Sequence, residues 1–130
     1  MDWDRPPWNR WTFQRIRNVM PTSTVWRGTN PAPALPRNEQ DIEQVQFTRS
    51  NQASQSIADF LDDSYTDGFL VMADGHIVHE SYYNGMKPHT THLMQSVSKS
   101  ITSTVTGIMI GRGQLDPQAL VKTYIPELAD

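Results

Sequence analysis

The chain has 130 residues, of which 37% are hydrophobic, a length that suits one domain with a thin core. Its formal net charge is −3, with acidic and basic residues interspersed, which excludes a basic face for nucleic acid and a polybasic stretch for anionic lipid. It has no cysteine, which excludes disulfides and thiolate metal sites.

The chain shows neither a secretory signal nor a membrane span. Its start, MDWDRPPWNRW, lacks the basic residues and apolar run that a signal peptide requires. The longest uncharged stretch, residues 100–111, is too short and too rich in hydroxyls to cross a bilayer. We therefore expect a soluble cytoplasmic protein without a nucleic-acid or membrane partner.

The first predicted element is an N-terminal helix within residues 1–20. Trp11, Ile16 and Val19 recur at roughly helical spacing, and Pro21 ends the pattern. Residues 21–53 are expected to be irregular, because Gly28 and several prolines fall in them (Pro21, Pro31, Pro33 and Pro36). Val25 and Trp26 predict that this segment is pinned along a surface.

A second helix and a hairpin follow within residues 54–130. Residues 54–65 place apolar side chains on one face and acids on the other, which predicts an amphipathic helix. The runs GFLVMAD and HIVHESYY, residues 68–74 and 76–83, are typical of strands. Asp74-Gly75 between them predicts a type I′ turn, which needs a positive φ at both central residues.

The order helix, loop, helix, hairpin, helix indicates an α+β or mixed α/β fold in which helices pack on an antiparallel hairpin. Two strands alone are marginal in water. We therefore expect the sheet to need further strands, the chain to be an incomplete portion of one domain, and its unpaired edge to favour self-association.

The last predicted helix, residues 96–113, carries no charge between Lys99 and Arg112. One stripe of it is apolar and another consists mostly of small residues, which is typical of an interior helix with two packed faces. Lys99 is then a lone cation at the buried start of the helix, and an unpaired buried lysine tends to mark function.

Ser96 and Lys99 are the candidate catalytic pair. Three residues apart on one helix, they share a face. A serine hydroxyl is a poor nucleophile unless a base takes its proton. Lysine, with a reference pKa of about 10.4, acts as that base only when burial and the helix N-terminus favour its neutral form. The alternative is that Ser96 is only an N-cap and the Ser-x-x-Lys spacing is fortuitous.

The wider sequence resembles the β-lactamase-related, penicillin-recognising serine hydrolases. The resemblance rests on GFLVMADGHIVHESYYNG, HLMQSVSKSITSTVTGIMIGRGQLDP and YIPEL, a strand–turn–strand followed by the serine–lysine helix and its exit segment. The opening NRWTFQRIRNVMPT is most similar to the branch of 6-aminohexanoate-dimer hydrolases and related esterases. The fold expected from this resemblance is the N-terminal part of a β-lactamase-like fold, with the nucleophile at the start of a buried helix.

The resemblance implies that Ser96 is acylated by a small-molecule amide or ester, that Lys99 accepts its proton, and that the Ser96 N–H helps to bind the oxyanion. The family also uses a downstream Tyr-x-Asn or Tyr-x-Ser element and a Lys- or His-x-Gly element, and neither follows Ser96 here. Tyr82-Tyr83-Asn84 matches the first literally but lies upstream, so we assign it no role. An inactive fragment of such a hydrolase is the alternative function.

No cofactor or metal is expected. His76 and His79, three apart on a strand, point to opposite faces. His89 and His92 lie in a loop without an acidic or third ligand nearby. The G-x-S-x-G element of the α/β-hydrolases is absent.

Overall fold

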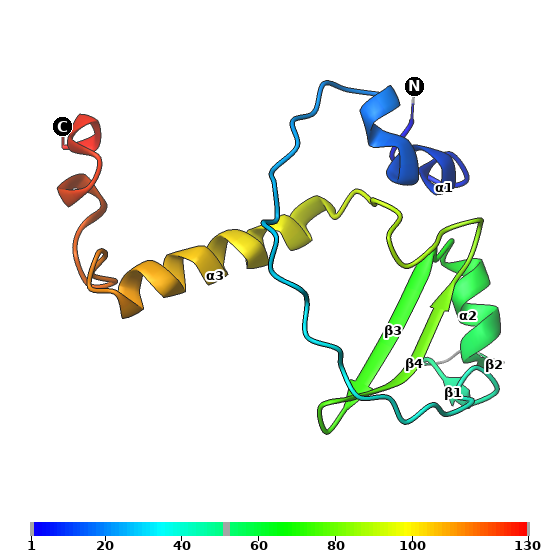
Figure 1. The fold of residues 1–130 in the computed structure, drawn as a ribbon. Coiled ribbons are helices and arrows are strands. Elements are labelled where there is room, and N and C mark those ends of the chain that lie inside the picture. The colour runs from blue at the N-terminus through cyan, green and yellow to red at the C-terminus, as the bar shows by residue number, and fades with distance from the viewer. Residues whose placement is uncertain (1, 51–52, 130) are drawn as a thin grey trace. The chain divides into compact units, whose positions relative to one another are not determined.

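The computed structural model describes residues 2–50 and 53–129 (Figure 1). It divides the chain into two compact units, Met1–Leu93 and Met94–Asp130. The first unit contains both hairpins and the N-terminal helices, and the second contains the helix predicted to carry the nucleophile. The mixed α/β character expected from the sequence is confirmed.

The N-terminal helix is shorter and less regular than predicted. Helix α1 spans Asn9–Thr12, and the 3₁₀ segment η1 follows over Phe13–Asn18. Arg15 leaves the helical region with φ −134° and ψ 33°, which breaks the helix at its middle. The buried Thr12 hydroxyl donates to the Trp3 carbonyl at 2.5 Å and so ties the chain start to α1.

Backbone hydrogen bonds from residues 36–40 attach the irregular segment to the hairpin, and the hydrophobic side chains of the segment do not. Val25 is 92% exposed and Trp26 is 76% exposed, so the prediction that they pin the segment is wrong. Residues 36–40 instead run parallel to the next hairpin, bonded through backbone groups. Asn38 N donates to Ile77 O and Gln40 N to Val78 O, both at 2.8 Å. Backbone pairing of this kind leaves no hydrophobic pattern in the sequence.

The helix predicted over residues 54–65 begins later than expected. Strand β1, Gln46–Thr48, pairs antiparallel with β2, Ser54–Ser56, and helix α2 spans Ile57–Asp63. Ser56 is both the end of β2 and the N-cap of α2, in a capping box with Asp59. The cap fixes where the helix starts, and so residues 54–56 remain free to pair as a strand.

The hairpin prediction is confirmed. Strands β3, Gly68–Ala73, and β4, His76–Tyr82, pair antiparallel, and Asp74 and Gly75 have φ of 49° and 75° (Figure 1). The register shifts between Val71 and Met72, which leaves β4 one residue longer than its partner there, a β-bulge. The buried apolar residues of the described chain lie on α2 and at the bulge, namely Leu61, Ile77 and Val78.

The second unit is built from helical segments. The 3₁₀ turn η2 spans Gln95–Val97, α3 spans Ser98–Gly111, and the short η3 and η4 span Val121–Thr123 and Pro126–Leu128. Gly113, with φ 67°, ends α3 in a Schellman arrangement, with Gln114 N bonded to Met109 O at 2.9 Å.

The predicted burial of α3 is not found in this chain, because none of its residues is buried. Its apolar stripe is about half exposed along its length, at Val97, Ile101, Val105 and Ile108. The described part of the second unit supplies only short 3₁₀ turns and no sheet, whereas a helix with two apolar faces needs a layer on each. Across residues 2–50 and 53–129, no helix is long and apolar enough to cross a membrane.

Candidate active site

Ser96 and Lys99 lie next to each other at the start of α3. Lys99 Nζ donates to Ser96 Oγ at 3.1 Å. Ser96 lies in the η2 turn, directly before α3, and Lys99 lies in the first turn of α3. The helical spacing alone brings the two side chains into hydrogen-bond range, which is the distance a proton transfer between them requires.

The residue before the serine has an uncommon backbone conformation. Gln95 has φ 48°, in the left-handed region that a non-glycine residue rarely adopts. This region costs a side-chain-bearing residue about 1–2 kcal/mol, and such residues cluster at functional sites. The turn is closed by Val97 N, which donates to Met94 O at 3.1 Å. Ser96 therefore stands at a sharp bend and not in the middle of a regular helix.

The environment of the pair differs from the buried one predicted. Ser96 and Lys99 are both exposed in this chain, and so are most residues of α3. Over the described residues, Lys99 has no carboxylate ion-pair partner.

The Tyr82-Tyr83-Asn84 element has structural contacts in the first unit. The Tyr82 hydroxyl donates to Glu80, and this bond together with Arg37 lowers the pKa of the Glu80 carboxyl. Asn84, with φ 51°, donates through its amide to the Arg10 carbonyl at 3.0 Å. These contacts place the element at the end of strand β4 and in the turn that follows it.

A polar network joins β4 to the segment after residue 40. Tyr83 donates to Glu43 at 2.5 Å, and His79 Nε2 lies 3.3 Å from the same carboxylate. The Tyr83 hydrogen bond lowers the pKa of Glu43, and burial together with that bond raises the pKa of Tyr83. Ser81 contacts both His79 and Tyr83. Sequence reasoning missed this network because Glu43 and Tyr83 are 40 residues apart.

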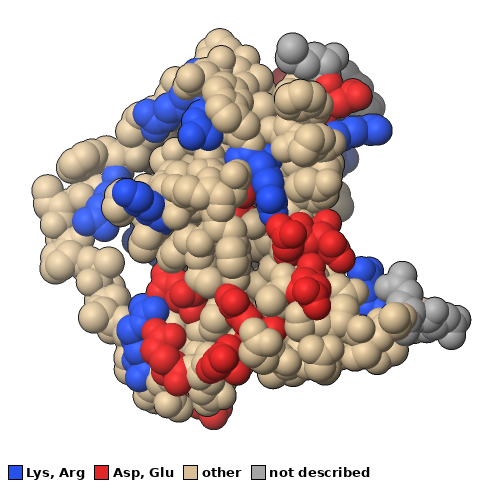
Figure 2. Space-filling view, turned by 90° about the vertical axis from the view of Figure 1, so that its right-hand side faces the viewer, with Lys and Arg blue, Asp and Glu red and all other residues tan. Residues whose placement is uncertain are grey.

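Charges of both signs lie side by side on the surface. Figure 2 shows acidic side chains next to basic ones on one face. In the first unit Arg37 pairs with Glu39 at 2.6 Å and with Glu80 at 2.7 Å. Among residues 2–50 and 53–129, no group of three or more His, Asp or Glu side chains could hold a metal ion.

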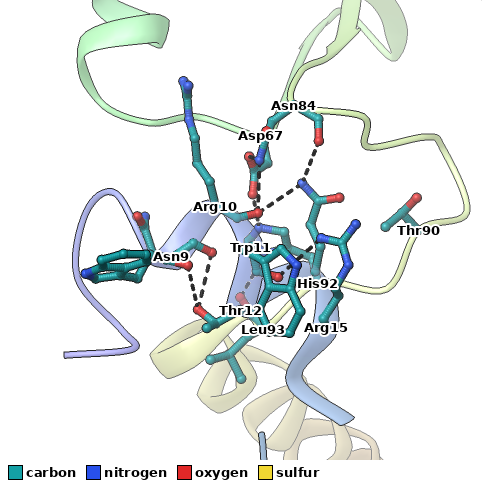
Figure 3. Close-up of polar contacts among 12 residues, drawn as sticks. Asn9, Arg10, Trp11, Thr12, Arg15, Asp67, Asn84, Thr90, His92 and Leu93 are labelled. Carbon is teal, nitrogen blue, oxygen red and sulfur yellow. Dashed lines mark hydrogen bonds and ion pairs between the residues drawn. The ribbon is translucent and has the colours of Figure 1, made fainter. Parts of the chain in front are cut away.

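The segment leading to the nucleophile is held by a second network (Figure 3). His92 Nε2 lies 3.0 Å from Asp67 Oδ2, and Leu93 N donates to Phe13 O at 2.8 Å. The Phe13 and His92 rings meet edge to face at 5.7 Å between centroids. The prediction placed His92 in a loop without an acidic neighbour, which is wrong, because Asp67 comes from a position 25 residues earlier.

Comparison with known proteins relates the chain to one family. A β-lactamase family model matches residues 54–130. A 6-aminohexanoate-dimer hydrolase of Paenarthrobacter ureafaciens is 36% identical over 127 residues, which cover 98% of this chain and 31% of that protein. The structure of a putative 6-aminohexanoate-dimer hydrolase from Bacillus anthracis aligns with a TM-score of 0.85 at 25% identity, over 99% of this chain and 33% of that one. The chain thus spans about a third of the length of these relatives, and it belongs to the β-lactamase family.

Proposed function

We propose that this chain carries the nucleophile and base of a serine hydrolase that cleaves a small amide or ester. The observation that carries the proposal is the 3.1 Å contact between Lys99 Nζ and Ser96 Oγ at the bend before α3. A lone Ser-x-x-Lys spacing is a weak signal, but its place at the start of a helix in a β-lactamase family chain is a specific one.

The proposed reaction has two stages. Ser96 Oγ attacks the carbonyl carbon while its proton passes to Lys99 Nζ, and the negative charge on the carbonyl oxygen is stabilised in part by the Ser96 N–H. The C–N or C–O bond then breaks, and the leaving group takes a proton. Water next attacks the acyl-serine, releasing the carboxylic acid and restoring the serine hydroxyl.

The names of the relatives support a substrate class for the proposed activity. Both are named as hydrolases of 6-aminohexanoate dimer, and the identity with the first of them extends over 98% of this chain. We therefore propose a short linear amide as the substrate, with esters of similar size as alternatives.

The test is covalent labelling by a fluorophosphonate, followed by intact-mass spectrometry. We expect one adduct on the wild-type chain and none on Ser96→Ala. Ser98→Ala and Ser100→Ala are matched controls from the same helix start and should label normally, because Lys99 contacts Ser96. In Lys99→Arg the side chain is always protonated and cannot accept the Ser96 proton, so labelling should fall by about 10²–10⁴.

Two outcomes would contradict the proposal. Labelling that survives in Ser96→Ala would place the nucleophile elsewhere. An unlabelled wild-type chain that is demonstrably folded would mean that Ser96 is not activated by the groups in these 130 residues, and the inactive-fragment alternative would then describe the chain.

A further inference from the structure

Asn84 is the one asparagine of the sequence that stands directly before a glycine. Asn84 and Gly85 are the two central residues of the turn after β4, which is closed by Met86 N donating to Tyr83 O at 2.9 Å. Both have a positive φ, 51° and 75°, as the central residues of a type I′ turn do. Both are exposed, and a Cβ built on Gly85 meets no atom of the residues around it within 4 Å. Solvent therefore reaches this pair of residues freely.

An asparagine before a glycine is open to attack by the next backbone nitrogen. The Gly85 nitrogen bonds to the side-chain carbonyl carbon of Asn84, the bond from that carbon to Nδ2 breaks, and Nδ2 leaves as ammonia with the proton of the Gly85 N–H. Water then opens the cyclic imide at either carbonyl, which leaves an aspartate or an isoaspartate. Glycine favours this reaction because it has no Cβ to hinder its nitrogen and adopts the widest range of backbone conformations.

The folded first unit commits the Asn84 side chain to other partners. Its amide nitrogen donates to the Arg10 carbonyl at 3.0 Å and lies 3.4 Å from Asp67 Oδ1 (Figure 3). The backbone of this residue is held as well, since its carbonyl accepts a hydrogen bond from Gln14 Nε2 at 3.3 Å. The side chain has to leave both oxygen partners before Gly85 N can reach its carbonyl carbon. Attack consequently requires a local opening of the turn.

The product of the reaction does not fit the place that the amide leaves. An amide nitrogen donates, whereas a carboxylate only accepts, so the Arg10 carbonyl loses its donor. The Asp67 side chain is 4% exposed, and a second carboxylate beside it meets a like charge where water screens little. We propose that Asn84 is a deamidation site that the folded unit protects, and that its reaction irreversibly releases the turn after β4 from Arg10 and Asp67. Deamidation at Asn84 is independent of the proposed hydrolase function.

The first test follows deamidation of the whole chain by peptide mapping with tandem mass spectrometry, in native buffer and in guanidinium chloride. In denaturant we expect Asn84 to react fastest of all asparagines, because each of the others precedes a larger residue. In native buffer its rate should fall by roughly 10-fold or more, because only the open turn reacts. Gly85→Ala, compared with the wild type in denaturant, should slow the reaction at Asn84 by roughly 10-fold, since its Cβ hinders the attacking nitrogen.

The second test asks whether the fold accepts the product. We expect Asn84→Asp to unfold at a lower temperature than the wild type. Asn38→Asp makes the same change of charge at an exposed asparagine and should leave the unfolding temperature unchanged. Adding Asp67→Asn to Asn84→Asp restores an amide–carboxylate pair with the roles exchanged, so the double variant should unfold at a higher temperature than Asn84→Asp alone.

Three results would each overturn the proposal. Asn84 could react no faster than the other asparagines in denaturant, or equally fast in native buffer and in denaturant, or Asn84→Asp could be as stable as the wild type. A double variant that is no more stable than Asn84→Asp would overturn the part assigned to the Asp67 carboxylate.

Discussion

The ionisation of Glu43 is tied to a contact with residues distant in the sequence. The Tyr83 hydroxyl donates to Glu43 Oε1 at 2.5 Å. His79 Nε2 lies 3.3 Å from the same oxygen. The hydrogen bond from Tyr83 lowers the pKa of Glu43, because it stabilises the carboxylate and not the acid. Glu43 thereby holds the segment after residue 40 against β4.

Replacement of Tyr83 by Phe should make the protein less stable in a pH-dependent way. Because the folded-state pKa of Glu43 is lowered, its contribution is present above the unfolded pKa, about 4.3, and is lost as the pH falls through the folded value. We expect Tyr83→Phe to cost about 1 kcal/mol at neutral pH and progressively less in acid. Urea unfolding at several pH values measures this difference.

Tyr65→Phe is the control, since it removes a hydroxyl while keeping the ring on which the Arg10 guanidinium lies. It should leave the pH dependence of stability unchanged. A Tyr83→Phe cost that is the same at neutral and acidic pH would show that the Glu43 carboxylate is not the partner that matters.

At the scale of elements, the sequence predicts what neighbouring residues decide. The turn of the β3–β4 hairpin is such a case, because Asp74 and Gly75 adopt the positive φ that their types favour. The Ser96–Lys99 contact is another, since one helical turn creates it. Strand β1 and the parallel segment 36–40 could not be predicted in this way. Each has only three to five residues without hydrophobic alternation and becomes ordered only through partners distant in sequence.

The difference between local and distant contacts also explains which contacts near the candidate site the sequence could not predict. Asp67 and His92 are 25 residues apart, and nothing in either local sequence marks them as a pair. The bulge in β4 is equally hidden, because it depends on how β3 and β4 align and not on a glycine in the strand.

Gly75→Ala should destabilise the hairpin. Gly75 has φ 75°, where a Cβ costs about 1–2 kcal/mol even though no atom lies within 4 Å of it. Gly107→Ala is the matched control, because Gly107 lies inside α3 without a positive φ and also has open space at its Cβ. At this position alanine should favour the helix by about 1 kcal/mol relative to glycine.

Thermal unfolding and far-ultraviolet circular dichroism distinguish the two changes. The Gly75 variant should unfold at lower temperature, and the Gly107 variant should not. A Gly75 variant as stable as the wild type would mean that the turn adopts another conformation in solution.

In each of the two units, the described residues include large apolar side chains that are exposed. Within residues 2–50 and 53–129, β3 pairs with β4 alone, and Leu70 and Met72 on β3 are about half exposed. The apolar stripe of α3 is exposed to a similar degree. An uncovered strand edge with exposed apolar side chains is a template for pairing with another chain. Self-association through this edge therefore stays a prediction.

Sedimentation velocity over a concentration series tests it. We expect the wild-type chain to associate, and Leu70→Lys on β3 to reduce the association, because an edge lysine opposes strand pairing. Val25→Lys is the control, since Val25 is an exposed apolar residue of the irregular segment. A wild-type chain that stays monomeric at all concentrations, or equal effects of both substitutions, would contradict association through β3.

The division into two units has a consequence for spectroscopy. All four tryptophans, Trp3, Trp8, Trp11 and Trp26, belong to the unit Met1–Leu93, whereas Ser96 and the longest helix belong to the other. Tryptophan fluorescence therefore observes only the unit without the nucleophile, while α3 makes the largest helical contribution to ellipticity among the described helices. If the two signals change together on heating, the two units unfold cooperatively, and if they change at different temperatures, the unit that carries the nucleophile unfolds separately.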